Sequence, residues 1–297
     1  MNRLMKKYGV WEESQKVFSE VDWKAAKEIT VGIDVGTTST EAVVMCDRKI
    51  LCYSIIKTGM DFKNAAEKAI NKAIEGLDIE LKDVTKVVCT GFGHKNVAFA
   101  SAYVDEIHCH GKGARYMFGP SVTTVIDMGG QTVKAVRLHS WDRVRDFMVN
   151  DKCATGMGHN IEELCELLQI SLDKIGEKSL EVERDPEPVS TTCYAYAQTE
   201  TMGMFHPGFR EETTTENEVY AGHMFAIAWR ILGVVGKLQP LEVGELAVYP
   251  ELGLTGGLAK NPGIVKRLER ELKITALTSE YDPMLAGAIG AALYALE

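Results

Sequence analysis

This chain of 297 residues lacks the long apolar segments that mark membrane and exported proteins. No apolar run reaches the roughly 18 residues that a helix needs to span a bilayer. Residues 1–27 carry charges of both signs and have no apolar core of the kind found in signal peptides. We therefore expect a cytoplasmic protein without a membrane segment.

An excess of basic residues is also absent. Lys and Arg total 33 against 42 Asp and Glu, which gives a net charge of −9. This balance argues against broad binding to nucleic acids or to membrane surfaces. Hydrophobic residues make up 45% and charged residues 25% of the chain, as in globular proteins, and the length suits two domains.

The cysteines do not form the pattern of a disulfide-rich protein. They are scattered, odd in number and not accompanied by an export signal, so we expect core thiols or metal ligands. The seven are Cys46, Cys52, Cys89, Cys109, Cys153, Cys165 and Cys193. One lies in the run His108-Cys109-His110, but neighbouring helical residues point about 100° apart and do not converge on one ion. We expect no zinc site there.

One pattern occurs twice. Residues 33–43 read Ile-Asp-Val-Gly-Thr-Thr-Ser-Thr-Glu-Ala-Val, and residues 126–136 read Ile-Asp-Met-Gly-Gly-Gln-Thr-Val-Lys-Ala-Val, with an offset of 127 − 34 = 93 residues. Each copy lies between apolar runs, which predicts a strand, a tight Gly turn and a second strand. An Asp at a strand end can hold a hydrated cation, and bare backbone N–H groups can hold phosphate oxygens. Two such hairpins facing each other would grip a metal-bound polyphosphate from both sides.

A third Gly-rich turn follows a strand-like run near the C-terminus. Residues 254–261 read Leu-Thr-Gly-Gly-Leu-Ala-Lys-Asn. A single turn of this kind is weak evidence, but three in a fixed order are specific. No Walker A sequence is present, which argues against a P-loop fold.

The remaining pattern alternates strands and helices. We expect helices over 61–76, 105–118, 161–168, 224–238 and 283–296, strands over 85–89, 246–248 and 252–254, and a solvated loop over 211–218. The mixture and the internal duplication predict an α/β fold of two similar lobes. We expect a helical extension over 1–28, a first lobe over 29–125 and a second lobe over 126–297, with the C-terminal helix packing back on the first. The extension either covers its own domain or docks to a partner.

The order of the three turns resembles the actin, hexokinase and Hsp70 ATPase superfamily, which implies ribonuclease H-like lobes with a nucleotide in the cleft. Asp34 and Asp127 would then hold Mg through water. Gln131 is a candidate to orient the attacking water, and a turn-stabilising amide is the alternative. The backbone and hydroxyl groups for phosphate would come from Gly36, Thr37, Thr38, Gly129 and Gly130, and those for adenosine from Gly256 and Gly257.

Two cysteines lie beside predicted helix starts, where N–H groups and the helix dipole favour thiolate. Cys153 lies in Asn-Asp-Lys-Cys-Ala-Thr-Gly-Met-Gly at residues 150–158, and Cys193 ends Thr-Thr-Cys. Their spacing alone fits core residues. The segments resemble the signature of the BadF/BadG/BcrA/BcrD-type ATPases, which include activators of 2-hydroxyacyl-CoA dehydratases and ATPase subunits of benzoyl-CoA reductases. The likeness runs from about residue 29 to 296. It implies one [4Fe-4S] cluster shared between two subunits, each giving two Cys.

The chain departs from the activators at several positions. Glu41 stands where the first hairpin usually ends in Lys, Thr132 stands in place of Asp, and residues 197–200 read Ala-Gln-Thr-Glu instead of Ala-Glu-Ser-Glu. The activators are homodimers, whereas these departures suit one subunit of an unequal dimer. They favour the shorter ATPase subunit (D/Q type) of a class I benzoyl-CoA reductase, with a homodimeric dehydratase activator as the alternative.

The resemblance implies coupling of ATP hydrolysis to electron transfer from ferredoxin in anaerobic aromatic degradation. The expected partners are a homologous ATPase subunit that completes the cluster and two cluster-bearing subunits that reduce an acyl-CoA, which together form a heterotetramer. A small-molecule kinase of the same superfamily is an alternative, with Asp151 as the nearest candidate catalytic carboxylate. A non-catalytic nucleotide sensor is disfavoured because both Asp residues and all three turns are present.

Overall fold

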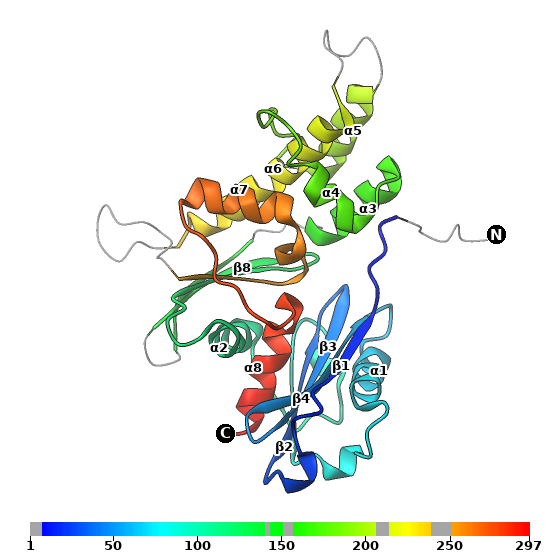
Figure 1. Cartoon of the computed structure of the whole chain (residues 1–297), viewed down its shortest axis with the longest axis vertical. Coiled ribbons are helices and arrows are strands. Elements are labelled where there is room, and N and C mark those ends of the chain that lie inside the picture. Colours follow the sequence, from blue (N-terminus) through cyan, green and yellow to red (C-terminus); the bar gives the residue numbers. More distant parts are fainter. Residues whose placement is uncertain (1–7, 140–142, 151–156, 206–213, 239–250) are drawn as a thin grey trace, which may run out of the picture.

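The computed structural model describes residues 8–139, 143–150, 157–205, 214–238 and 251–297. Two sheets with helices against them form two lobes, one above the other in Figure 1. The lower lobe holds a six-stranded sheet of order β1-β4-β3-β2-β5-β6, and the upper lobe holds a four-stranded sheet of order β10-β7-β8-β9. The predicted α/β architecture of two lobes is therefore confirmed.

The first sheet is built around the first hairpin. β2 (Ile29–Val35), β3 (Ser39–Cys46) and β4 (Lys49–Lys57) are antiparallel neighbours, while β5 (Lys86–Thr90) pairs parallel to β2, and β6 (Ala102–Tyr103) pairs parallel to β5. Helix α1 (Phe62–Ile74) packs on this sheet and begins at Asp61, whose side chain accepts from the Asn64 backbone N–H. The predicted helix over 61–76 thus starts at an N-cap.

The second sheet repeats the hairpin. β7 (Thr124–Met128), β8 (Val133–Leu138) and β9 (Val144–Val149) are antiparallel, and β10 (Leu252–Thr255) pairs parallel to β7. Asp34 faces Glu41 across the first hairpin, and Asp127 faces Lys134 across the second. The sequence repeat is therefore a structural repeat, with equivalent registers.

Two helices cross between the lobes. α2 (Glu106–Phe118) packs against α8 (Ala286–Ala295), which follows the 3-10 turn η6 (Pro283–Leu285). A Cβ at Gly113 would lie 1.8 Å from the Ala286 carbonyl oxygen, and one at Gly290 would lie 1.9 Å from that of Cys109. Only glycine allows so close an approach. On its other side α8 lies against the first sheet, where the Thr30 hydroxyl donates to the Ala292 carbonyl at 3.1 Å.

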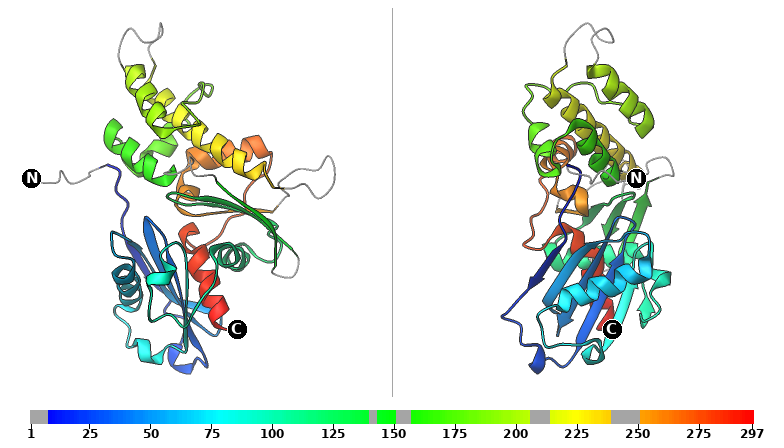
Figure 2. Two further views of the ribbon diagram at one scale, coloured as in Figure 1. Left: turned by 180° about the vertical axis from the view of Figure 1, so that it is seen from behind. Right: turned by 90° about the vertical axis from the view of Figure 1, so that its right-hand side faces the viewer.

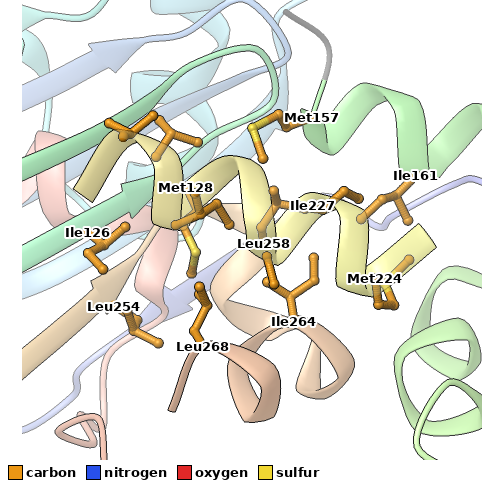
Figure 3. Packing of buried hydrophobic residues seen from close by; sticks show 14 of the residues in the cluster. Ile126, Met128, Met157, Ile161, Met224, Ile227, Leu254, Leu258, Ile264 and Leu268 are labelled. Atoms are coloured by element: carbon orange, nitrogen blue, oxygen red, sulfur yellow. The ribbon is translucent and has the colours of Figure 1, made fainter. Parts of the chain in front are cut away.

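The rest of the upper lobe is helical. Its helices are α3 (Met157–Leu168), α4 (Leu172–Lys178), α5 (Tyr194–Phe205), α6 (Glu216–Val235) and α7 (Pro262–Leu272), with the 3-10 turn η5 (Gly257–Lys260). Figure 3 shows how Met128 of the sheet meets Ile227 of α6 and Leu268 of α7 in one core. The chain also has 3-10 turns η2 (Leu81–Asp83) and η3 (His94–Asn96) in the lower lobe.

The predicted loop over 211–218 ends earlier than expected. Residues 206–213 lie outside the described part of the chain, but Glu216 already belongs to α6. The reason is a capping box, in which Thr215 accepts from the Glu218 backbone N–H and the Glu218 carboxylate accepts from that of Thr215. The strand expected over 246–248 also lies outside the described residues.

The expected helical extension over 1–28 is wrong for the part that the structure describes. Residues 8–28 contain strand β1 (Ser14–Val17), which pairs antiparallel with β4, and the 3-10 turn η1 (Trp23–Ala25). Before the strand, the Tyr8 and Gly9 backbone N–H groups donate to the Glu166 carboxylate of α3 at 2.7 and 2.9 Å. The segment therefore runs from the sheet of the lower lobe to a helix of the upper one (Figure 2).

No helix within the ranges described above is long and apolar enough to cross a bilayer.

Candidate functional site

The two hairpins of the repeat meet between the lobes. Asp34 lies near the end of β2 and Asp127 near the end of β7, and both are buried. His110 of α2 lies between them, with Nε2 3.6 Å from an Asp34 carboxylate oxygen and Nδ1 3.4 Å from one of Asp127. The structure thus brings both predicted carboxylates to one imidazole.

The turns of the two hairpins touch as well. A Cβ at Gly130 would lie 2.3 Å from the Thr38 hydroxyl oxygen, so the second turn rests directly on the first. Gly129 donates to the Thr132 carbonyl at 2.9 Å, and the Gly36 carbonyl accepts from the Thr58 hydroxyl at 2.9 Å. The residues predicted to hold phosphate, which include Thr37, therefore gather at one place. They are half-buried, whereas the two carboxylates behind them are buried.

The third turn lies beside the second hairpin because β10 pairs with β7. The Thr255 hydroxyl donates to the Asp127 carboxylate at 3.1 Å. Gly256 has φ +82°, and a Cβ there would lie 2.4 Å from the Met128 carbonyl oxygen, so both its conformation and its surroundings require glycine. Gly257 begins η5 directly after it. All three predicted turns meet at this end of the two sheets.

The second hairpin neutralises its own carboxylate. The Lys134 ammonium lies 3.0 Å from Asp127 and 3.3 Å from Glu106 of α2. Burial alone would raise the pKa of Asp127, but His110 and Lys134 bring it below its ordinary value. Burial alone would lower the pKa of Lys134, yet the two carboxylates raise it. Both groups are therefore charged at neutral pH.

The first hairpin has two acids in the same positions. Burial raises the pKa of Asp34, and burial together with Asp34 raises the pKa of Glu41 well above its usual range. The Asp34 carboxylate is held between two glycines. A Cβ at Gly91 would lie 2.2 Å from one of its oxygens, and one at Gly287 would lie 1.9 Å from the other. The first hairpin therefore fixes its carboxylate without a lysine.

This donor set suits a hydrated magnesium ion. Mg²⁺ keeps several waters and binds through one or two carboxylates together with substrate phosphates. In the part of the chain that the structure describes, no three His, Cys, Asp or Glu side chains converge as direct metal ligands. Asp34 and Asp127 are therefore two buried carboxylates that could hold a metal ion between these hairpins.

Gln131 lies at the rim of the second turn. Its side chain is exposed, while its carbonyl accepts from the Asn150 side-chain amide at 3.4 Å. Asn150 also accepts from the Val133 backbone N–H at 2.9 Å, which fixes the base of the turn. The Gln131 side chain can therefore reach a ligand above the turn.

The described cysteines fall into two groups. Five are buried, and burial raises the pKa of Cys46 to about 11 and those of the others to about 12. The other buried ones are Cys52, Cys89, Cys109 and Cys165. Such thiols are inert core residues. Cys193 is partly exposed and directly precedes α5, whereas Cys153 and Asp151 lie outside the described residues.

The segment before Cys193 is pinned by Arg230 of α6. Its guanidinium donates to the Thr191 carbonyl at 2.6 Å and to the Ser190 carbonyl at 2.8 Å. On the other side, the Tyr194 hydroxyl donates to the Asn160 carbonyl of α3 at 3.1 Å. Cys193 therefore stands between two fixed elements.

Helix α3 also touches the phosphate turns. It begins just after the segment that carries Cys153, and the Gly158 and His159 backbone N–H groups donate to the Gly130 carbonyl at 3.0 and 3.2 Å. One helix thus connects the second turn with both cysteine segments.

Sequence reasoning missed the roles of His110, Lys134 and Gly287. His110 stands out in the sequence only through its run with His108 and Cys109, where no zinc site is expected. It lies three residues before Gly113, however, and therefore shares the helix face that meets α8. The signal for Lys134 is its position opposite Asp127 in the predicted hairpin. Nothing in the local sequence around Gly287 indicates the approach of Asp34.

Proteins of known role match nearly the whole chain. An activator of lactoyl-CoA dehydratase from Anaerotignum propionicum is 34% identical over 271 residues, which cover 90% of this chain and 97% of that protein. The D-type subunit of benzoyl-CoA reductase from Thauera aromatica is 29% identical over 276 residues, 90% of this chain and 92% of that one.

A solved structure agrees with the fold. The activator of the 2-hydroxyisocaproyl-CoA dehydratase from Clostridium difficile, with bound ADPNP, superposes with a TM-score of 0.77 at 27% identity and covers 90% of this chain and 94% of that one. The expected actin, hexokinase and Hsp70 type of fold is thereby confirmed. The sequence pattern of the BadF/BadG/BcrA/BcrD ATPase family matches residues 31–295, and the chain belongs to that family.

Proposed function

We propose that this protein hydrolyses ATP to drive electron transfer into an enzyme that acts on an acyl-CoA. The observation that carries the proposal is the meeting of the two hairpins, where Asp34 and Asp127 share His110 and Gly130 rests on Thr38. A metal-bound triphosphate placed there would touch both lobes. Its hydrolysis would then alter how the lobes meet.

The roles at the nucleotide follow from position. Asp34 and Asp127 hold Mg through water, the half-buried turns hold phosphates, and Gly256 and Gly257 border the adenosine. Gln131 orients the attacking water, which fits its exposed side chain beside the second turn. These assignments extend what the family resemblance implies to residues that lie together.

The electron-carrying site would be formed by Cys153 and Cys193. A [4Fe-4S] cluster takes four thiolates and supplies a low-potential electron carrier, so two subunits with two Cys each would complete it. Cys193 fits this role because it is partly exposed and precedes a helix, whereas the five other described cysteines are buried. The chain's part is to hold each thiol at a surface that a homologous subunit can reach.

Helix α3 offers a physical route between the two sites. Its first N–H groups bind the Gly130 carbonyl, and its Asn160 carbonyl binds the Tyr194 hydroxyl beside Cys193. A change at the second turn would therefore move α3 and, with it, the segments that carry both cysteines. Coupling of this kind needs no direct contact between nucleotide and thiol.

In its finer form, the proposal is the shorter ATPase subunit of a class I benzoyl-CoA reductase, with ferredoxin as donor and two cluster-bearing subunits as acceptors. Glu41 and Thr132, which differ from the activator pattern, support it, as does the 29% identity to a subunit of a benzoyl-CoA reductase. The second candidate is a homodimeric dehydratase activator, which the 34% identity to a lactoyl-CoA dehydratase activator supports.

Anaerobic purification with mass analysis of the co-purifying chains and an iron count separates these candidates. An unlike ATPase subunit with two further cluster-bearing subunits supports the reductase, and a dimer of identical chains supports the activator. Cys193→Ala should abolish bound iron and electron transfer but leave ATP binding intact, whereas Cys165→Ala, at a buried thiol, should keep the iron. An iron-free protein that phosphorylates a small molecule would refute the proposal.

A further inference from the structure

The two hairpins carry an acid and a base at equivalent positions. Glu41 follows Asp34 by 41 − 34 = 7 residues, and Lys134 follows Asp127 by 134 − 127 = 7 residues. Each pair also faces across its hairpin in the same register. The first hairpin therefore has the acid Glu41 at the position where the second hairpin has the base Lys134.

This difference changes the charge balance around the first carboxylate. Asp127 has Lys134 at 3.0 Å, but across the strand from Asp34 lies Glu41, with Cβ atoms about 4.5–5.5 Å apart in such pairs. Like charges that face each other directly in a sheet destabilise it. The basic groups near Asp34 are His110 and Lys134, and both also serve Asp127.

Glu41 itself is buried and incompletely bonded. Only 4% of its surface is exposed, and its Oε1 has no hydrogen-bond partner among the described residues. Ser39 donates to the carboxylate, and the charged groups that act on it are the acids Asp34, Asp282 and Asp127. A buried acceptor without a partner loses the hydrogen bonds that water would give it, and the loss is larger when the acceptor is charged. The Glu41 carboxylate therefore lacks a second hydrogen-bond donor and a nearby positive charge among the described residues.

A hydrated divalent cation would supply both. Its waters donate hydrogen bonds to carboxylate oxygens, and its charge offsets the two acids. The start of α8 lies over the same face, where Gly287 approaches Asp34, and a helix N-terminus adds only a partial positive charge. The ion would therefore be the main compensation for the first hairpin.

We infer that Glu41 is a second carboxylate of the cation site at the first hairpin, where it accepts from water bound to the ion that Asp34 also holds. The inference rests on the proposed nucleotide role of Asp34. As a consequence, nucleotide binding in this chain depends more steeply on a divalent cation than it would with a Lys at this position.

The test compares variants of the purified anaerobic complex. ADP affinity is measured by calorimetry with chelator and across a Mn²⁺ series, and free Mn²⁺ is followed by electron paramagnetic resonance. Glu41→Gln should weaken Mn²⁺ binding in the presence of ADP by about 10–100-fold, as loss of an outer carboxylate does at other metal sites. Glu41→Lys should tighten ADP binding in chelator and flatten its dependence on Mn²⁺. Glu67→Gln, at an exposed position on α1, is the matched control and should match the wild type.

The outcomes are distinct. Unchanged Mn²⁺ affinity in Glu41→Gln, with metal-dependent ADP binding in the wild type, would overturn the role of Glu41 and leave a proton shared with Asp34 as its explanation. If ADP binding by the wild type does not depend on metal at all, the proposed role of Asp34 fails as well. Thermal unfolding in chelator checks the fold, because Glu41→Gln is isosteric and removes a like-charge pair.

Discussion

Replacement of Gly287 by alanine tests how closely the interlobe helix approaches the first carboxylate. A Cβ at this position would lie 1.9 Å from an Asp34 carboxylate oxygen and 3.2 Å from the His110 Cε1 atom. The carboxylate has little room to retreat, because Gly91 borders its other oxygen. Gly287→Ala should therefore displace Asp34 from His110.

The size of the effect follows from two opposing contributions. Alanine within a helix gains about 0.5–1 kcal/mol over glycine. Overpacking of a tight contact costs about 1–3 kcal/mol. Gly233 of α6 provides the comparison, since nothing lies within 4 Å of a Cβ there. Gly233→Ala should raise the free energy of unfolding by about 0.5–1 kcal/mol. The free energy of unfolding of Gly287→Ala should be about 1–3 kcal/mol lower than that of Gly233→Ala.

Two measurements check this prediction on the same samples. Urea unfolding without nucleotide gives the difference in stability between the two variants. Calorimetry with Mg–ADP gives the affinity, which should fall in Gly287→Ala because the displaced carboxylate would no longer reach the water of the proposed metal site. The affinity of Gly233→Ala should equal that of the wild type.

Equal stabilisation by the two substitutions would refute the reasoning, because it would mean that α8 has room for a methyl group at Asp34. Loss of stability with unchanged Mg–ADP affinity would keep the packing argument but contradict the proposed role of Asp34.

Three further predictions concern other parts of the molecule. Lys134→Met should cost about 3–5 kcal/mol near neutral pH because it removes the ammonium partner of the buried Asp127 carboxylate. Urea unfolding across pH should show the full loss of stability between pH 3.8 and pH 10.5, the ordinary pKa values of Asp and Lys. The loss should shrink as the pH falls through the lowered pKa of Asp127, and also as the pH rises through the raised pKa of Lys134. Arg230→Gln, which removes the charged donors to the Ser190 and Thr191 carbonyls, should speed iron loss from the proposed cluster at Cys193 in chelator by about tenfold, and an unchanged rate would contradict the pinning of that segment. Gly9→Ala, whose Cβ would lie 2.0 Å from the Glu162 carbonyl oxygen, should speed amide exchange over residues 8–10 but not in β1, and equal exchange would refute the contact with α3.

The hairpins could be predicted because the information for them is local. A strand, a Gly turn and a second strand follow one another in the chain, and the second copy supports the first. The helices over 61–76 and 105–118 could be predicted to within two residues because Asp61 and Asp105 cap them. Such signals do not depend on distant residues.

The N-terminal segment could not be predicted in the same way. Its apolar residues, among them Trp11 and Phe18, fit one side of a helix, but in the structure they pack on the core beneath α8. β1 exists because β4 offers an unpaired edge, for example where Gln15 meets Ser54. That partner lies far away in sequence, so the local pattern favoured the wrong element.

In the candidate site, too, the features that depend on local sequence could be predicted, and those that depend on distant residues could not. The convergence of Asp34 and Asp127 could be inferred because each lies near the end of a strand of a repeated unit. The position of His110 could not, since it depends on the crossing of α2 and α8, which Gly113 and Gly290 permit. A sequence shows that two glycines are present, but not that their helices meet.

Helix α3 is the element on which the proposed coupling depends. The second turn binds its first N–H groups through the Gly130 carbonyl, the N-terminal segment binds its last turn at Glu166, and the Tyr194 hydroxyl binds the Asn160 carbonyl in its first turn. The N-terminal segment is itself anchored in the sheet of the lower lobe, so α3 is tied to both lobes. A movement of one lobe against the other cannot leave all three contacts unchanged. We therefore expect relative motion of the lobes to strain or shift α3, which is what the proposed coupling of nucleotide hydrolysis to an electron carrier requires.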